Sequence, residues 1–265
     1  MKSIFPVPTI QTIQKVIIAV HFSALGGLIY FWDPIWFSLS FFMYILFFWL
    51  GHEMYYHRFL SHNSFSMPLW MQKFLATVGV YCLFGTPIGI ASTHAIHHKH
   101  ADTDKDPHPA HYPVQAWMWT YHAMNSKDRA IIARLSKNQW LKTIGKHYFL
   151  IYFSTIIACL IIDPRIAVYG FLVPAVYGFF TNSLVNVACH RWGYQNHKLS
   201  NNSRNNLLVN CFLFFGGSAL HNNHHISPMN YKISQRWYEV DLVGCLAHII
   251  HTFKNRNINT PLDKE

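Results

Sequence analysis

Long apolar stretches alternate with polar, histidine-rich stretches along this chain. The strongest apolar runs fall in four ranges: residues 12–30, 34–51, 148–162 and 166–188. An α-helix rises about 1.5 Å per residue, so roughly 20 apolar residues cross the ~30 Å hydrocarbon core of a bilayer. The pattern therefore predicts an all-α integral membrane protein with four transmembrane helices.

The connections between the apolar runs predict that they pair as two hairpins. The first pair is joined through Phe31–Pro34 and the second through Asp163–Arg165, so both short turns should lie on one side of the membrane. The other side then receives the rest of a single domain that covers residues 1–265: a helical cap formed by residues 52–147 and 189–254, and a loose tail at residues 255–265.

Two further apolar segments, Leu69–Ser92 and Asn206–Leu220, run directly into histidine clusters. Gly85, Pro87 and Gly89 interrupt the first of them. A crossing by either segment would carry its histidines to the side opposite the others. We therefore expect both segments to be helices that lie in or against the membrane surface.

The charge distribution predicts the orientation. The chain has 21 Lys and Arg against 11 Asp and Glu, a formal net charge of +10. The two short turns contain only Arg165 of these basic residues, so by the positive-inside rule the cap is cytoplasmic. Basic residues next to anionic lipid explain the charge, and we expect no nucleic-acid partner. The first ten residues contain no cleavage site of a secretory signal.

The histidines form clusters with metal-ligand spacing. His94, His97 and His98 occupy positions i, i+3 and i+4, which lie on one side of a helix and can converge on one or two ions. The same spacing recurs in His221-Asn222-Asn223-His224-His225. Two copies of this pattern in one chain are typical of a metal centre built from distant segments.

A third cluster, His57-Arg58-Phe59-Leu60-Ser61-His62, has a spacing that is harder to interpret. Around a regular helix its two histidines would point well apart, which suits ligands of two neighbouring ions or of a helix end. His52 stands five residues before His57 and forms an overlapping pair. We favour His57 and His62 as ligands and keep His52 as the alternative.

In chain order, the clusters at 57–62, 94–98 and 221–225 resemble the first, second and third histidine boxes of the membrane fatty-acid desaturases. Other segments resemble the family as well: TDKDPH at 103–108, RWGY at 191–194, NSRNN at 202–206 and RWYEVD at 236–241. The resemblance covers residues 51–242 and is greatest to the acyl-CoA, stearoyl-type delta-9 subgroup.

The resemblance implies one more ligand and several supporting residues. Asn186-Val187-Ala188-Cys189-His190 is similar to the NxxxH of the family, in which the histidine binds one metal and the asparagine holds a metal-bound water. The expected metal ligands are thus His57, His62, His94, His97, His98, His190, His221, His224 and His225. The residues expected to orient these ligands or to bind a substrate head group are Asp104, Asp106 and His108, together with Asp102. Glu53 is not expected to be a ligand.

The expected chemistry is oxidation at two iron ions. Removing hydrogen from an unactivated methylene needs a strong oxidant, which biology usually derives from dioxygen at Fe(II) with open coordination positions. The resemblance implies a cis double bond introduced at position 9 of an acyl chain. The chain contains no Glu-x-x-His pair, which argues against the soluble ferritin-like diiron design. Zinc could replace iron as an inert ion in purified protein.

The reaction needs external electrons, and the chain lacks a haem motif, a cysteine-rich ferredoxin segment and a dinucleotide fingerprint. A separate donor such as a ferredoxin, a rubredoxin or a cytochrome b5-like protein should dock on the basic cytoplasmic face. The acyl substrate could be carried by CoA, by acyl carrier protein or by an intact membrane lipid.

Departures from the family pattern keep two alternatives open. Thr93 and Ala95 flank His94 where the family has an acidic residue and an arginine, and Gly217–Leu220 lacks an acid and an aromatic residue. A similar diiron site could instead hydroxylate an acyl chain, a sterol or a carotenoid. A non-catalytic metal-binding or transport protein is the second alternative, but it predicts ionisable groups within the spans, where only His21 lies.

Overall fold

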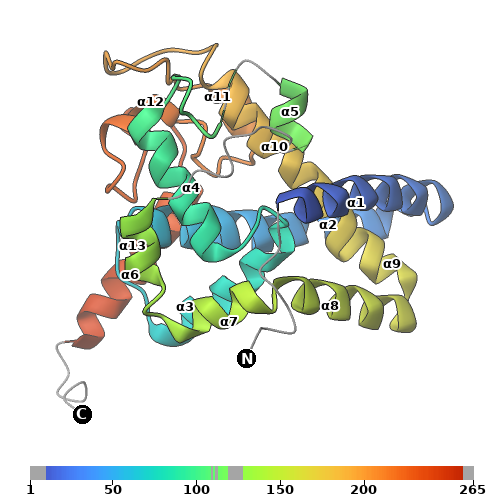
Figure 1. Ribbon diagram of the computed structural model, residues 1–265. Coiled ribbons are helices and arrows are strands. Elements are labelled where there is room, and N and C mark those ends of the chain that lie inside the picture. The colour runs from blue at the N-terminus through green and yellow to red at the C-terminus, as the bar shows by residue number, and fades with distance from the viewer. Residues whose placement is uncertain (1–9, 109, 111–112, 119–127, 259–265) are drawn as a thin grey trace.

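The computed structural model describes residues 10–108, 110, 113–118 and 128–258, and in this part the chain is helical (Figure 1). Two backbone bridges, Tyr194 with Asn205 and Asn205 with Leu220, are isolated and belong to no strand within the described residues. The predicted all-α class is therefore confirmed for this part of the chain.

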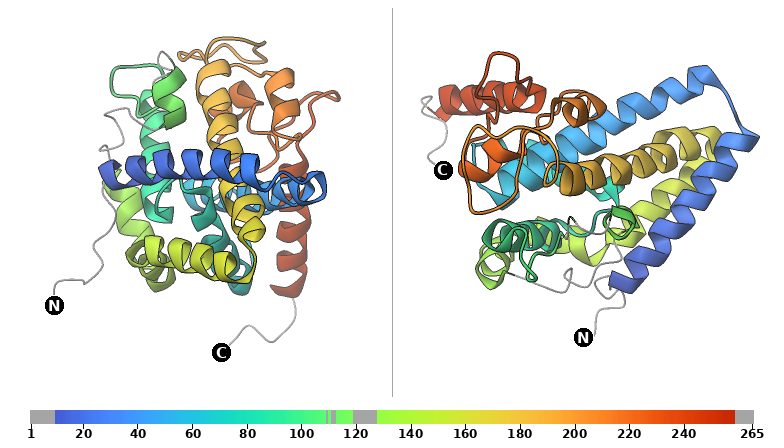
Figure 2. Two further views of the ribbon diagram at one scale, coloured as in Figure 1. Left: turned by 90° about the vertical axis from the view of Figure 1, so that its right-hand side faces the viewer. Right: turned by 90° about the horizontal axis from the view of Figure 1, so that it is seen from above.

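Four long helical segments extend toward one end of the molecule (Figures 1 and 2). In chain order they are α1 (Ile10–Tyr30); α2 (Pro34–Tyr44) continued by η1 (Ile45–Ser61); α8 (Tyr148–Ile162); and α9 (Pro164–Ala167) continued by η4 (Val168–Leu172) and α10 (Val173–Ala188). They agree with the predicted apolar ranges to within a few residues, with one exception. The second segment continues as one helix to Ser61. Its C-terminal part, η1, is π-helical and carries the first histidine box.

Both hairpin turns end in the same helix-capping arrangement. An aspartate caps the following helix, and a proline takes the first helical position, where no N–H is needed. The Asp33 carboxylate accepts the N–H of Ile35 at 2.8 Å, and the Asp163 carboxylate accepts the N–H of Arg165 at 2.9 Å. The two turns lie at the end of the molecule remote from the histidine boxes (Figure 1).

Within the described residues, two helices are long and apolar enough to cross a membrane, Pro34–Ser61 and Pro164–Ala188. Two further pairs qualify only if each bent pair is counted as one span. These are α3 (Leu69–Val78) and η2 (Gly79–Cys82) with α4 (Pro87–His100), bent by 77°, and α7 (Gln139–Lys146) with α8, bent by 62°. The structure thus contains two to four candidate spans, and the first bent pair includes the segment that we expected to lie along the membrane.

The opposite end of the molecule consists of shorter helices around the C-terminal part of η1. Besides α3, η2, α4 and α7 they are α6 (Arg129–Leu135), α11 (Leu207–Phe212), α12 (His221–Ile226) and α13 (Leu242–Ile258), while α5 (Pro113–Met118) packs on α10.

The two segments expected as helices before the second and third boxes are both interrupted. The first breaks between η2 and α4, where Leu83 has a φ of 59° and Gly85 a φ of 120°. The second is helical only in α11, because Phe214 and Phe215 adopt φ values of 49° and 63°. A right-handed helix cannot continue through residues in this left-handed region. A loop therefore leads into the third box.

The backbone of α13 is helical to Ile258, so residues 255–258 of the expected loose tail are helical. Neither proline nor glycine occurs between Gly244 and Pro261 to end the helix earlier. Residues 259–265 of that tail lie outside the described residues.

A buried ion pair joins the first box to the segment after the third. Arg58 is only 1% exposed, and its guanidinium donates to both carboxylate oxygens of Asp241 at 2.9 Å. It also donates to the carbonyl oxygens of Tyr231 at 2.6 Å and Gly216 at 3.1 Å. Asp241 accepts a further bond from the N–H of Ile233 at 2.8 Å. These bonds hold three distant segments in one arrangement.

We predict that Asp241→Ala destabilises the fold by about 3–5 kcal/mol, because the Arg58 charge would stay buried without its counter-ion. Denaturation of the detergent-solubilised protein measures this loss. Arg165→Ala is the control, since it breaks an ion pair with Asp163 in which the arginine side chain is 42% exposed, and such pairs contribute little. Equal losses in the two variants would contradict the prediction.

Candidate metal centre

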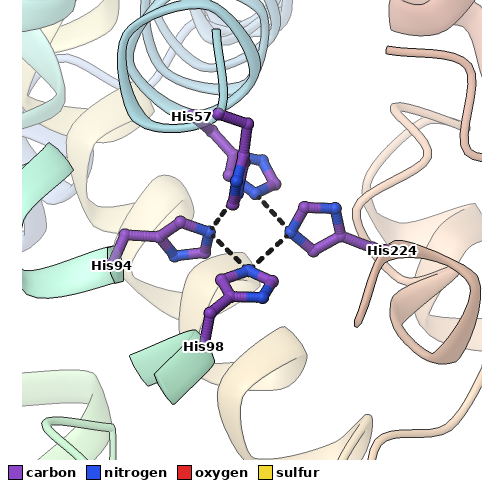
Figure 3. A group of neighbouring side chains, drawn as sticks. His57, His94, His98 and His224 are labelled. Carbon is purple, nitrogen blue, oxygen red and sulfur yellow. Dashed lines mark hydrogen bonds between the residues drawn. The ribbon is translucent and has the colours of Figure 1, made fainter. Parts of the chain in front are cut away.

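The nine histidines predicted as ligands come together in two groups. The first group contains His57, His62, His94, His98 and His224, and the second contains His97, His190, His221 and His225. In each group, one ring nitrogen per residue lies within 4.8 Å of the others. Figure 3 shows four side chains of the first group with their rings pointing toward a common centre. Each group could hold a metal ion.

The π-helical winding of η1 explains how the first box contributes both of its histidines. In a π-helix the N–H of residue i+5 bonds to the carbonyl of residue i, and the N–H of His62 is 3.3 Å from the carbonyl oxygen of His57. Residues five apart therefore come to the same side, and the ring centroids of these two histidines are 5.1 Å apart. Around a regular helix the two rings would point well apart, and the π-helical winding removes this separation.

His52 stands five residues earlier on the same helix but belongs to neither group. Its ring packs edge-on against Phe84, with centroids 4.8 Å apart. Its Nδ1 atom lies 3.3 Å from the Glu53 carboxylate. The structure thus separates His52 from the two histidines that we favoured.

The second box divides its histidines between the groups. α4 begins at Pro87 with the Thr86 side chain as its N-cap, and it presents His94 and His98, one turn apart, to the first group. The Nε2 atom of His98 is 3.0 Å from that of His94 and 2.9 Å from that of His224. His97 lies in the second group, 3.2 Å from the Nε2 atom of His225. One helix therefore supports both groups.

The third box makes the complementary division. In α12, His224 reaches the first group, where its Nε2 atom is 2.9 Å from that of His57. His221 and His225, one turn apart, belong to the second group, and their Nε2 atoms are 3.0 Å apart. His190, just after α10, completes the second group with its Nε2 atom 2.9 Å from that of His221.

Asn186 lies one turn before His190 on α10. It is 7% exposed, and its Nδ2 atom has no hydrogen-bond partner among the described residues. A buried amide group without a partner is unusual in folded proteins. Its position one turn before His190 is compatible with the role implied by the family resemblance.

Three carboxylates determine where the protons of three ligands lie. The pairs are His57 Nδ1 with Glu53 at 3.0 Å, His97 Nδ1 with Asp106 at 2.8 Å, and His190 Nδ1 with Asp102 at 3.0 Å. An ionised carboxylate only accepts hydrogen bonds, so each of these rings carries its proton on Nδ1. The lone pair of each Nε2 atom is then directed into its group, as in histidines that bind metals.

The distances between ring nitrogens fit bound metal ions. The His221 ring also hydrogen-bonds to the backbone of Ser218, and the Nε2 atoms of His221 and His190 face each other 2.9 Å apart. Two facing lone pairs repel each other unless a cation lies between them. Metal–nitrogen bonds of about 2.1 Å at right angles place two nitrogens about 3.0 Å apart. The nitrogen donors thus have the chemistry and spacing of a metal site.

Burial keeps the donors neutral. It lowers the pKa of His221, His224 and His225 well below the usual value for imidazole, and neighbouring histidines lower it further. A neutral ring is the form that binds a metal. Burial raises the pKa of the Asp106 carboxyl to about 6, so this group is still mostly ionised at neutral pH and can accept the His97 proton.

Of the residues expected around the ligands, Asp106 and His108 lie beside the second group, and the His108 ring centroid is 5.0 Å from that of His97. Asp104 is exposed, and among the described residues its side chain contacts none of the nine histidines. Asp102 holds His190 and adopts a φ of 63°, while Glu53 holds His57 without being part of either group.

The structure also shows buried polar residues that spacing did not identify. Asn223, within the third box, accepts from Asn205 Nδ2 at 2.8 Å and donates to Glu239 at 2.8 Å. Glu239 also accepts from the hydroxyl of Tyr194 at 2.7 Å. The sequence signal for these residues is the pair Asn222-Asn223 between the ligands of α12. Because the histidines face the metal side, the two asparagines must project away from it.

Comparison with known proteins gives a consistent result. Residues 31–244 match the model of the family described as fatty acid desaturase. The chain is 30% identical over 221 residues to an acyl-CoA 5-desaturase of Anemone leveillei, which covers 79% of this chain and 66% of that protein. It is 30% identical over 240 residues to delta-9 acyl-lipid desaturase 2 of Arabidopsis thaliana, and this match covers 84% of this chain and 74% of that protein.

A third relative is the sn-1 stearoyl-lipid 9-desaturase of Anabaena variabilis, which is 28% identical over 209 residues, covering 76% of this chain and 75% of that protein. The chain therefore spans about two thirds to three quarters of the length of these relatives. The family match covers most of the chain and includes all nine histidines of the two groups. This chain belongs to the fatty acid desaturase family.

Proposed function

We propose that this protein is an O₂-dependent fatty-acyl desaturase that introduces a cis double bond into a saturated acyl chain. The observation that carries the proposal is the convergence of nine imidazoles into two groups in a member of this family. Two of the relatives described above are named for position 9 and for lipid-linked acyl chains. These names support position 9, with an acyl-lipid or acyl-CoA substrate.

The two groups would hold two Fe²⁺ ions, one on the five histidines and one on the four, with Asn186 adding a water-mediated contact. When bound, iron supplies the oxidant derived from O₂ that takes hydrogen from an unactivated methylene. The residues of the chain direct the ring nitrogens into the two groups and leave no thiolate there that the oxidant could attack. Of the five cysteines, none is in either group.

A small cavity lies between η1 and α10, close to the first histidine group. Its volume is about 30 Å³, and Glu53, which holds His57, is among its lining residues. The wall farther from the histidines contains the stacked rings of Tyr44 and Phe48, and the Tyr44 hydroxyl donates to Thr181 at 3.1 Å. We propose that the acyl chain enters this cavity by displacing side chains along its apolar wall.

For the membrane we propose four spans, formed by α1, the first part of the α2–η1 helix, α8, and α9 with η4 and α10. The shared end of the two aspartate-capped turns supports this arrangement (Figure 1). The histidine groups would then face the cytoplasm within the cap, in agreement with the excess of basic residues in that part of the sequence.

The first test is the fatty-acid profile of cells that express the wild type or His224→Ala. We expect a new cis-monounsaturated acid with the wild type alone, because His224 reaches two other ligands in the first group. Mass spectrometry locates the double bond. His248→Ala is the matched control, since His248 is exposed and belongs to neither group. A hydroxylated product would favour the alternative oxidation.

Iron content tests the division into two groups. We expect that His94→Ala and His221→Ala each reduce bound iron from about two ions to about one per chain, because they affect different groups. Elemental analysis of protein loaded anaerobically with Fe²⁺ measures the ratio. Loss of all iron in both variants would contradict independent groups.

Removal of an orienting carboxylate should weaken metal binding without removing a ligand. We expect Glu53→Gln and Asp106→Asn each to lower metal affinity about 10–100-fold, since partners of ligating histidines typically have effects of this size. Competition with a chelator measures the affinity. Asp104→Asn is the control, because this side chain is exposed. Equal affinities in all three variants would refute the role of the carboxylates.

A further inference from the structure

Acidic side chains in the described residues are almost all directed inward. Glu53, Asp102 and Asp106 hold histidines, while Glu239 and Asp241 are buried in hydrogen-bond networks. The acids that cap helices are partly buried: Asp33, Asp128 and Asp163. Asp104 is the only acid classed as exposed in the described part of the chain. The exterior near the histidine groups is therefore strongly basic.

One part of this exterior lies directly over the second histidine group. The loop after α10 reaches the group through two contacts. The N–H of Asn202 donates to Asp102 at 2.7 Å, and the Asn201 side chain is 3.4 Å from His225 Nδ1. Figure 1 shows this loop and the C-terminal end of α4 at the end of the molecule opposite the hairpin turns. Since Asp102 holds His190, this loop contacts both a ligand of the second group and the carboxylate behind another.

This part of the exterior continues onto the segment before α13. Arg236 donates to the Asn196 side chain at 3.2 Å, and the ring centroids of Tyr194 and Tyr238 are 6.1 Å apart. The exposed basic residues here are Lys105, Arg191, Lys198 and Arg236. Two exposed aromatic residues lie on the same loops, Trp192 at 61% and Trp237 at 94% exposure. We call these six residues the basic surface.

We infer that the basic surface is the docking site of a small acidic protein that carries single electrons, and that electrons enter through the group of four histidines. The inference rests on the proposed function. Desaturation consumes two electrons and two protons, together with O₂ and the two hydrogens of the acyl chain, and releases two molecules of water. Positive charge attracts an acidic partner, and exposed tryptophan and arginine are typical of protein interfaces.

The test uses the full-length, iron-loaded protein in detergent and a plant-type [2Fe–2S] ferredoxin of net negative charge. The variant is Lys105→Glu with Lys198→Glu, two exposed residues that hold no ligand. The control is Lys142→Glu with Lys146→Glu, which makes the same charge change on exposed positions of α7. We measure the Kd of ferredoxin without O₂, the KM for ferredoxin during turnover, and kcat with dithionite-reduced methyl viologen as the donor.

We expect the Kd and KM for ferredoxin to rise about tenfold or more in the variant, and the rise to shrink at high ionic strength because salt screens charge. The dye-driven kcat should stay unchanged, since the histidine groups are intact. Ferredoxin binding that is equal in the wild type and the variant, or weakened equally in the control, would overturn the inference. If the wild type makes no double bond with either donor, the proposed function fails, whereas the anaerobic Kd values still decide the docking site.

Discussion

The structure depends on one electrostatic constraint, which is that nine imidazoles must direct ring nitrogens into two small volumes. Lone pairs about 3 Å apart repel one another, so without cations the fold must hold them there against a cost. Carboxylates behind His57, His97 and His190 fix the tautomers. The Arg58–Asp241 pair fixes the segments that carry the first and third boxes. Much of the buried polarity of the cap therefore serves to position nitrogen atoms.

The asymmetry between the two groups follows from helix geometry. At 3.6 residues per turn, residue i+4 points about 40° to one side of residue i and residue i+3 about 60° to the other. α4 and α12 can therefore each divide three histidines of one helix face between two neighbouring groups. α4 contributes two histidines to the first group and one to the second, whereas α12 contributes one to the first and two to the second. This leaves room for the pair from η1 in the first group and for His190 in the second.

Much of this could be predicted from the sequence, because it depends on local spacing and long apolar runs. The four long helices and the ligand candidates are in this class. Three features depended on tertiary context. The π-helical winding of η1 has no clear signature in residue types, so the convergence of His57 and His62 was not predictable from spacing. The end of α11 is set by left-handed residues at Phe214 and Phe215, which sequence preference alone disfavours. Which of the expected aspartates holds a histidine depends on the loop after α10, since Asp102 contacts His190 and Asn202 whereas Asp104 is exposed.

The unbroken helix from Pro34 to Ser61 has a mechanical consequence. It begins at a hairpin turn and ends at ligands of the first group, without a glycine- or proline-induced hinge in its hydrogen bonding. In a membrane, such a helix adapts to changes in bilayer thickness chiefly by tilting. Any tilt would move His57 and His62, and the bonds of Arg58 to Gly216 and Asp241 would pass the movement on to the segments around the third box. Bilayer thickness, which changes with the acyl chains of its own lipids, would then act directly on the geometry of the metal centre.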